Sequence, residues 1–463
     1  MAGLLASIPS CQSNPTLFFS GLYSPPSSCT LRDSFYETRP AAWSTGWIAN
    51  MHSLHSPTNE YHHHNPNASF IQSNARPDDR RCSAFPDPGN VLLVIKTGAT
   101  EIYEKLPTQL LTTLGCSRNY LIFSDLEERI GPYHIQDALA DYDPSLKESL
   151  PNFSLYCKQQ EYRRTGQDIA TLRKDGREAW TLDKYKFLHM VEMTWRERPS
   201  MDWYVFIETD TYLVWSNLLL WLQTLSADEA LYMGSVAYLD SEPFAHGGSG
   251  YVISRKLMER FVGADPGVAG RYDGVFEPEC CGDVVLARTI KKETDVGVQN
   301  FWPQVNGEKP ATLPFGPSHW CQPVVTMHHV EPRERSSIFA FEQARENISE
   351  PLLFRQLSEL AFPSHAMPEE EEDWDNFSNV PLVYLDGEVP TLETCRVDCL
   401  NRNDCFQYRY SSGECHVLTG AFQRGTKREA EPGRRWISGW NVKKIQSWRE
   451  SQICVEPEWV KGH

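Results

Sequence analysis

The sequence Trp203-Tyr-Val-Phe-Ile-Glu208-Thr-Asp210-Thr-Tyr212 decides the fold, because an apolar run ends there in two carboxylates spaced one residue apart. A continuous apolar run is typical of a strand buried on both faces in an α/β protein. Alternate side chains of an extended segment point the same way, so Glu208 and Asp210 can offer oxygen atoms to one divalent cation. The run therefore predicts a metal site at a strand end, with a solvated acidic turn as the alternative.

Two apolar runs precede this stretch, and polar groups follow each of them. Residues 91–95 are followed by Thr97-Gly98, and residues 120–123 are followed closely by Asp125. We interpret both runs as strands of the same sheet. In such a sheet, ligands gather in the crevice outside the carboxyl ends of the strands. These polar groups are therefore expected to face the crevice that Asp210 faces.

Helical patterns separate the predicted strands. Apolar residues recur at helical spacing between 182 and 195, which predicts an amphipathic helix that leads into the strand at Trp203. Another helix is expected to begin near residue 282, and it places Asp283 in its first turn. Strands that alternate with helices indicate an α/β fold with a mostly parallel sheet and flanking helices.

Two segments further along the chain are also candidates for the site. The first, Gly247-Gly248-Ser249-Gly250, precedes a short apolar strand, and glycine lets the backbone approach a ligand closely. In the second, residues 324–330, an apolar strand ends in His328-His329. Either imidazole can be a metal ligand or a hydrogen-bonded core residue.

The ordered set of these segments resembles the family-31 glycosyltransferases, which include Fringe and the core 1 β1,3-galactosyltransferases, and most closely their fungal branch. The resemblance covers residues 91 to 343. It implies a Rossmann-like GT-A domain that is metal-dependent and inverting. The implied reaction moves a hexose or N-acetylhexosamine from a UDP-sugar to a hydroxyl of a glycan or glycoprotein, with a β1,3 linkage.

The resemblance also implies roles for single residues. Glu208-Thr209-Asp210 takes the place of the DxD motif, with Asp210 as a direct ligand of Mn²⁺ or Mg²⁺ and Glu208 departing from the usual Asp. His328 matches the metal-binding His, and His329 is the less favoured ligand. Asp283 matches the catalytic base, although a carboxylate at a helix start can instead be a cap. The implied donor-binding residues are Thr97, Gly98, Asp125, Gly247, Gly248 and Ser249.

Composition limits the classes of function. The chain has 463 residues, enough for two folded parts and a tail. Its formal net charge is −17, which argues against nonspecific nucleic-acid binding because that requires Lys and Arg to neutralise phosphates. An acidic protein that binds an anionic nucleotide needs local cations. A metal ion can supply them.

Composition shifts predict the domains. We expect a disordered stem at 1–88, rich in Ser, Pro, Asn and His, and a glycosyltransferase domain at 89–365. An acidic linker is expected at 366–380, followed by a small disulfide-bonded module at 381–463. That module resembles a PAN/apple domain, which implies the pairs Cys395–Cys415 and Cys399–Cys405 and leaves Cys454 without a partner. Zinc binding is the alternative for these clustered cysteines.

The cysteine density and four N-x-S sequons favour a luminal or secreted protein, and the resemblance implies the Golgi. The family also implies a membrane anchor, but we find no convincing signal peptide and no run of roughly 20 apolar residues in this chain. A non-catalytic carbohydrate- or protein-binding surface protein, including an adhesin, is the alternative function. Neither the sugar nor the acceptor follows from the sequence.

Overall fold

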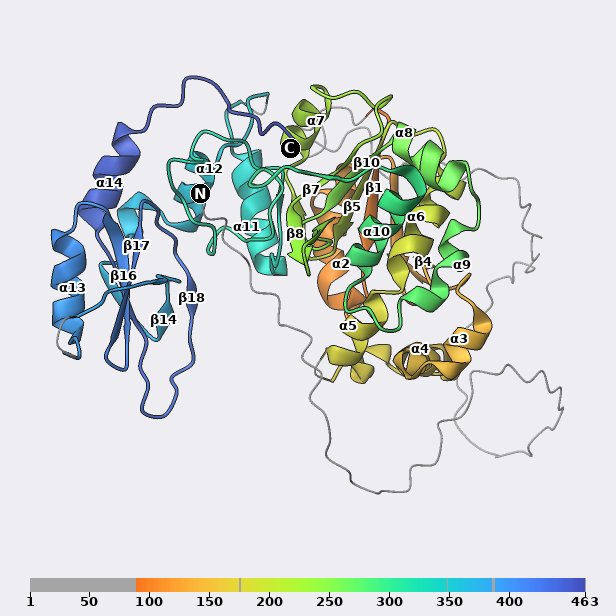
Figure 1. The fold of residues 1–463 in the computed structure, drawn as a ribbon, viewed down its shortest axis with the longest axis horizontal. Helices are drawn as coiled ribbons and strands as arrows, with labels where there is room; N and C mark the ends of the chain where they lie inside the picture. The colour runs from red at the N-terminus through yellow and green to blue at the C-terminus, as the bar shows by residue number, and fades with distance from the viewer. Residues whose placement is uncertain (1–88, 175, 348, 385–387, 463) are drawn as a thin grey trace, which may run out of the picture.

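The structure, a computed structural model, describes residues 89–462 apart from 175, 348 and 385–387, so the expected stem lies outside the described residues. In the described part of the chain, no helix has the length and apolar character that crossing a membrane requires. Eight strands form one mixed sheet in the order β11-β7-β10-β5-β1-β2-β4-β3 (Figure 1). Their bounds are β1 Val91–Lys96, β2 Tyr120–Ser124, β3 Glu128–Ile130, β4 Tyr133–Asp137, β5 Trp203–Glu208, β7 Tyr232–Gly234, β10 Tyr251–Ser254 and β11 Val298–Asn300.

The sheet is mostly parallel, which confirms the predicted α/β class. β1 lies between β2 and β5 and pairs with both in parallel, and β2 with β4 and β7 with β11 are parallel too. β10 runs antiparallel to both of its neighbours, β5 and β7, and β3 runs antiparallel to β4. The register pairs Lys96 with Glu208, so the carboxyl ends of β1 and β5 lie at the same edge.

Alternate residues of β1 and β5 build two cores. Leu92, Val94 and Phe206 pack into one core with α6 (Lys186–Glu197) and α10 (Gly282–Thr294). Leu93 and Ile207 pack into the other with α2 (Ile102–Leu111) and α7 (Trp215–Leu222). Because alternate side chains of a strand face opposite ways, a run that is apolar throughout must be buried on both faces, as observed. The sheet is therefore covered on both sides by helices.

Two sequence predictions require correction. The helix expected at 182–195 is two helices, α5 (Arg177–Asp183) and α6, separated by a turn at Lys184-Tyr185. Lys184 Nζ donates there to the carbonyls of Glu277 and Glu279, and these long-range bonds are invisible in a local pattern. The strand expected at 324–330 is only β12 (Thr326–Met327). It pairs with β6 (Tyr212–Leu213) in a separate two-stranded sheet.

The remaining elements of this part flank the sheet. The β8–β9 hairpin leads into the glycine loop at 247–250, and α11 lies beside α2. The bounds are α3 Pro144–Ser149, α4 Ser154–Thr165, β8 Val236–Leu239, β9 Glu242–Ala245, α8 Arg255–Met258, α9 Val268–Arg271, α11 Pro332–Gln343 and α12 Phe354–Ala361.

A second sheet follows in the order β13-β19-β16-β17-β15, with α13 and α14 beside it (Figure 1). The acidic residues expected in a linker instead form its edge strand β13, which pairs with β19. The charged side chains are tolerated because the strand is at an edge. The bounds are β13 Glu370–Glu372, β14 Trp374–Asp375, β15 Val380–Pro381, α13 Leu392–Asn401, β16 Cys405–Ser411, β17 Glu414–Thr419, β18 Thr426–Lys427, β19 Ile437–Trp440 and α14 Val442–Ser451.

Disulfides connect this module internally and to the first part. Cys395–Cys415 and Cys399–Cys405 are both formed, as the resemblance implied. Cys454, expected to lack a partner, is bonded to Cys321 across 133 residues of sequence. The chain after α14 returns to the first part, where Trp459 and Val460 pack against the core that α2 and α7 share. Figure 1 shows this return, with the C-terminus next to α7.

The two parts also share a hydrophobic core. Phe422 and Trp440 of the C-terminal module belong to the same buried cluster as Tyr212 of β6 and Met327 of β12. The backbone bonds join Phe315 and Phe422 in both directions, with N···O distances of 2.7 and 3.0 Å. β6 and β12 therefore rest on a core to which the module contributes.

The three sequons within the described residues differ in how far their asparagines are buried. Asn376 is fully buried, and its Nδ2 donates to the Tyr408 carbonyl at 2.9 Å, so the folded protein has no room for a glycan there. Asn347 is exposed and Asn152 is half-buried. Asn67 lies outside the described residues.

Candidate metal-binding and catalytic site

The turn that follows β5 carries the two carboxylates, and buried side chains hold its backbone. Arg335 of α11 donates Nη2 to the Thr209 carbonyl at 2.6 Å and Nη1 to the Thr211 carbonyl at 3.1 Å. Gln109 of α2 donates to the Thr211 carbonyl at 2.8 Å. Thr211 Oγ1 donates to the Gly248 carbonyl at 2.7 Å, which ties the turn to the glycine loop. The turn is therefore fixed before any ligand arrives.

The β6–β12 pair brings the turn and the imidazoles together. Tyr212 pairs with Met327, and the Val330 amide donates to the Asp210 carbonyl at 2.9 Å. As a result, Asp210, His328 and His329 can each offer a ligand atom, and these atoms lie within 4.8 Å of one another. His329 has φ of +57°, a left-handed conformation that is rare for a residue with a side chain. Such strain is common at functional sites.

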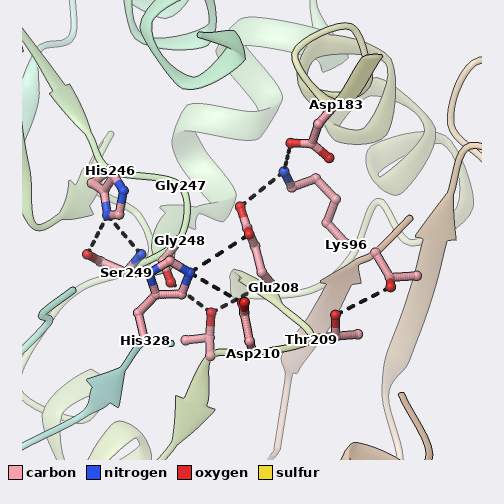
Figure 2. Close-up of polar contacts among 12 residues, drawn as sticks. Lys96, Asp183, Glu208, Thr209, Asp210, His246, Gly247, Gly248, Ser249 and His328 are labelled. Atoms are coloured by element: carbon pink, nitrogen blue, oxygen red, sulfur yellow. Dashed lines mark hydrogen bonds and ion pairs between the residues drawn. The ribbon is translucent and has the colours of Figure 1, made fainter. Parts of the chain in front are cut away.

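The polar atoms of this triad fit a cation. Oδ1 of Asp210 forms an ion-pair contact with Nε2 of His328 at 3.2 Å (Figure 2). Among the described residues, neither Oδ1 of Asp210 nor Nδ1 of His328 makes a hydrogen bond. Burial favours the neutral acid, yet contact with His328 and Lys105 holds the pKa of Asp210 below its ordinary value. An ionised carboxylate beside two imidazoles is a donor set that suits Mn²⁺.

Glu208 lies beside the triad but is held by a lysine. Its Oε1 is 3.0 Å from Nζ of Lys96, and Lys96 also pairs with Asp183 (Figure 2). Its Oε2 lies 4.0 Å from His328 Nε2. Although burial lowers the pKa of Lys96, Asp183 and Glu208 raise it above its ordinary value. Metal ligation by Glu208 stays a prediction, and it requires Glu208 to leave Lys96.

The glycine loop lets His328 approach. A Cβ at Gly248 would lie 2.2 Å from Cε1 of His328, so the imidazole packs directly on the backbone. In the same loop, the Gly247 amide donates to Oδ2 of Asp283 at 2.8 Å. Two predicted glycines thus have distinct tasks: Gly248 makes room for a triad residue, and Gly247 orients the carboxylate expected to be the base.

Asp283 is buried in the first turn of α10, with 8% of its surface exposed. Desolvation raises the pKa of its carboxyl to about 6, against the pull of the Gly247 amide. Among the described residues, its Oδ1 accepts from the Val284 amide at 3.0 Å, and the N-cap position belongs to Cys281 rather than to Asp283. A carboxyl with a pKa near neutrality is suited to general-base work.

His246 and Ser249 flank the glycine pair. Nδ1 of His246 accepts from the Ser249 amide at 3.2 Å and lies 2.8 Å from Ser249 Oγ. Burial and the nearby His328 lower the pKa of His246 to about 4, so its ring is neutral at physiological pH. With Nδ1 as acceptor, the proton of the neutral ring is on Nε2. Ser249, predicted to contact a donor, is buried and supports this loop.

The residues predicted to contact a nucleotide lie at the ends of β1 and β2. Oδ1 of Asp125 accepts from the Ala99 amide at 2.7 Å and Oδ2 accepts from Gln159 at 2.9 Å, so Asp125 fixes the loop that contains Gly98. Thr97 Oγ1 lies 3.3 Å from Thr209 Oγ1, and the Thr97 carbonyl accepts from Lys186. Nucleotide contacts by Thr97, Gly98 and Asp125 stay predictions.

Sequence reasoning missed the cations around these groups. Lys96 and Lys186 are buried among three carboxylates, and Lys105 and Arg335 flank Asp210. A Lys at the end of an apolar strand, as at Lys96, was the available signal. The others come from helices and carry no local pattern. A comparison with protein-family models finds no family model that matches this chain.

Proposed function

We propose that the protein is an inverting, metal-dependent glycosyltransferase of the GT-A type that uses a UDP-sugar and resembles the fungal family-31 enzymes. The single observation that carries the proposal is the convergence, at one edge of the sheet, of two different groups. One is the triad Asp210, His328 and His329, in which the buried Oδ1 of Asp210 and Nδ1 of His328 make no hydrogen bond among the described residues. The other is the buried carboxyl of Asp283. The glycine loop contacts both.

In this proposal, Asp210, His328 and His329 would hold Mn²⁺ or Mg²⁺. The cation, when bound, neutralises charge on the departing diphosphate. Side chains of the protein position the groups that take part in the reaction. Arg335 and Gln109 keep the Thr209–Thr211 backbone in place, so that Asp210 is positioned in advance. Preorganisation of this kind costs nothing at the moment of reaction.

Asp283 serves as the general base. It takes the proton of the acceptor hydroxyl while that oxygen bonds to the anomeric carbon and the bond from this carbon to the diphosphate breaks. The two oxygens sit on opposite sides of the carbon, so the configuration inverts. The Gly247 amide orients the carboxylate through a hydrogen bond at 2.8 Å. A pKa of about 6 makes Asp283 ionised at neutral pH yet basic enough to accept a proton.

We place the enzyme in the Golgi or elsewhere in the secretory pathway, with a glycan or glycoprotein as acceptor. Support comes from the disulfides, which form and persist in oxidising compartments. The PAN/apple-like module is proposed to stay attached to the catalytic part, because the two share a core.

A donor screen tests the proposal. Purified protein is incubated with UDP-Gal, UDP-GlcNAc, UDP-GalNAc or UDP-Glc and Mn²⁺, and release of UDP is measured. We expect one donor to be hydrolysed, EDTA to stop the reaction, and Asp210→Asn to abolish it. If a well-folded protein turns over none of them but binds glycans, the alternative of a non-catalytic carbohydrate-binding protein is correct.

A further inference from the structure

The cavity next to the triad contains three cationic side chains among its lining residues, although the chain as a whole is acidic. Its volume is about 140 Å³, and Lys105, Arg173 and Arg335 line it together with His329 and the carboxylates of Glu104, Asp210 and Glu331. A net charge of −17 repels anions at long range. An anion that binds this protein therefore needs a local cluster of cations, and this cavity contains one beside the triad.

Lys105 is shared between two carboxylates. Its Nζ lies 3.1 Å from Oδ2 of Asp210 and 3.1 Å from Oε2 of Glu101, one helical turn earlier. The Lys105 ammonium thus lies between two carboxylates and can pair with either of them. The other oxygen of Asp210 faces His328. One carboxylate thus serves both the triad and Lys105.

We propose that Lys105 is an exchangeable counter-ion of Asp210. In the absence of metal it neutralises this carboxylate. Once a divalent cation is held by Asp210, His328 and His329, Lys105 stays near the cavity through Glu101 and donates to a diphosphate anion there. The proposal rests on the proposed function, because that function identifies the anion as the diphosphate of a nucleotide donor.

The two arginines of the cavity differ in exposure and in their partners. Arg335 is fully buried with 1% exposure, and its two Nη atoms are occupied by the carbonyls of Thr209 and Thr211. It therefore contributes a fixed positive field. Arg173 is exposed and pairs with Glu104. Exposed ion pairs are weak, so Arg173 can exchange Glu104 for a phosphate oxygen.

Charge balance couples the two ligands. A divalent cation at Asp210 adds positive charge close to Lys105 and Arg335, and like charges at this separation repel. A diphosphate removes that repulsion. The cation and the anion should therefore strengthen each other's binding, and by thermodynamic linkage each does so by the same factor.

Lys105→Met tests the exchange, because its two effects have opposite signs. Mn²⁺ affinity, measured by electron paramagnetic resonance without nucleotide, should rise about threefold as a competing ion pair of modest strength is removed. UDP affinity, measured by calorimetry with saturating Mn²⁺, should fall about tenfold or more, since a charge-assisted hydrogen bond is lost. Arg173→Met should weaken UDP binding about threefold and leave Mn²⁺ affinity unchanged.

Lys256→Met is the matched control, because Lys256 is an exposed helical lysine paired with Glu259 at 3.2 Å, and it should change neither affinity. A parallel loss of Mn²⁺ and UDP affinity in Lys105→Met would mean that Lys105 only supports the structure, and unchanged UDP affinity would remove the anion subsite. Both results overturn the inference. If instead the opposite shifts occur but no UDP-sugar is turned over, the inference stands and the proposed function fails.

Discussion

The buried carboxyl of Asp283 has a raised pKa that suits the proposed role of general base. Its carboxyl is buried, and desolvation raises its pKa to about 6. We expect Asp283→Asn to lower kcat about 100-fold or more, since general-base catalysis contributes that much, and to leave UDP affinity unchanged. Steady-state kinetics and calorimetry measure the two. Asp295→Asn, at the exposed end of the same helix, is the control. Normal turnover in Asp283→Asn would assign the base to another residue.

The same pKa predicts a pH dependence. Because Asp283 must be ionised to accept a proton, kcat should fall as the pH drops through about 6, well above the ordinary value of 3.8. The contribution of Asp283 to folding stability has the opposite pH dependence to kcat. A pKa that is raised on folding means that the protonated carboxyl favours the folded state, and this contribution is lost as pH rises through about 6. Asp283→Asn should thus melt no lower than the wild type at pH 8. A melting temperature several degrees lower would instead indicate a structural role.

Gly248 offers a test of the triad that leaves its ligands intact. A Cβ there would lie 2.2 Å from the His328 ring, so Gly248→Ala must displace the imidazole. We expect Mn²⁺ affinity to fall at least about tenfold, comparable to losing an oriented ligand. Gly270→Ala is the control, since no described atom beyond its chain neighbours and its own helix backbone lies within 4 Å of the added Cβ. Equal Mn²⁺ affinities in the two variants would exclude His328 from the metal site.

At the level of elements, α11 supports the turn that carries Asp210. Arg335 donates to two carbonyls of this turn from a fully buried position. Arg335→Met leaves both without this donor, and we expect a loss of about 1–3 kcal/mol in unfolding free energy together with weaker Mn²⁺ binding. Arg333→Met, on the exposed face of the same helix, should change neither. Denaturant titration and Mn²⁺ binding are the measurements, and a stability loss with unchanged Mn²⁺ affinity would separate α11 from the site.

Local sequence patterns predicted the strands and helices whose buried positions follow a regular spacing. β1 and β5 are apolar at every position because helices cover both faces, and the strand end at Asp210 followed from that pattern. The pattern could not show which partner each polar group takes. Glu208 pairs with Lys96 across the sheet, and His329, the less favoured ligand, joins the triad through a left-handed turn. Such contacts depend on register and backbone conformation, which a linear sequence does not report.

The same limit explains the acidic segment. Its like charges indicated a solvated linker, but Glu370–Glu372 pairs with β19, and Arg424 binds Glu371 at 2.7 Å. An edge strand needs only backbone pairing on one side, so charge does not prevent it. Likewise, the Cys321–Cys454 bond spans 133 residues, and no spacing rule predicts it. The strand pairing of the acidic segment and this disulfide depend on residues far apart in the chain, which local sequence patterns do not report.

At the scale of the whole molecule, the C-terminal module helps to support the two strands next to the candidate metal site. β6 and β12 carry the turn at Asp210 and the imidazole of His328, and they pack in one core with Phe422 and Trp440 of the module. The Cys321–Cys454 bond and the packing of Trp459 add a second attachment. A sequence-based division at 366–380 separates residues that the structure packs together. We therefore expect the protein to unfold as one cooperative unit.

Phe422→Ala tests this unity. Phe422 is fully buried and contacts Phe315 of the first part through ring and backbone. Removing a buried phenyl ring costs about 3–5 kcal/mol, so we expect a lower melting temperature, a single calorimetric transition and weaker Mn²⁺ binding at 25 °C. Val389→Ala, at an exposed position of the same module, should leave all three unchanged. Two transitions, with only one shifted by Phe422→Ala and Mn²⁺ affinity intact, would show that the module folds independently and that the metal site does not depend on it.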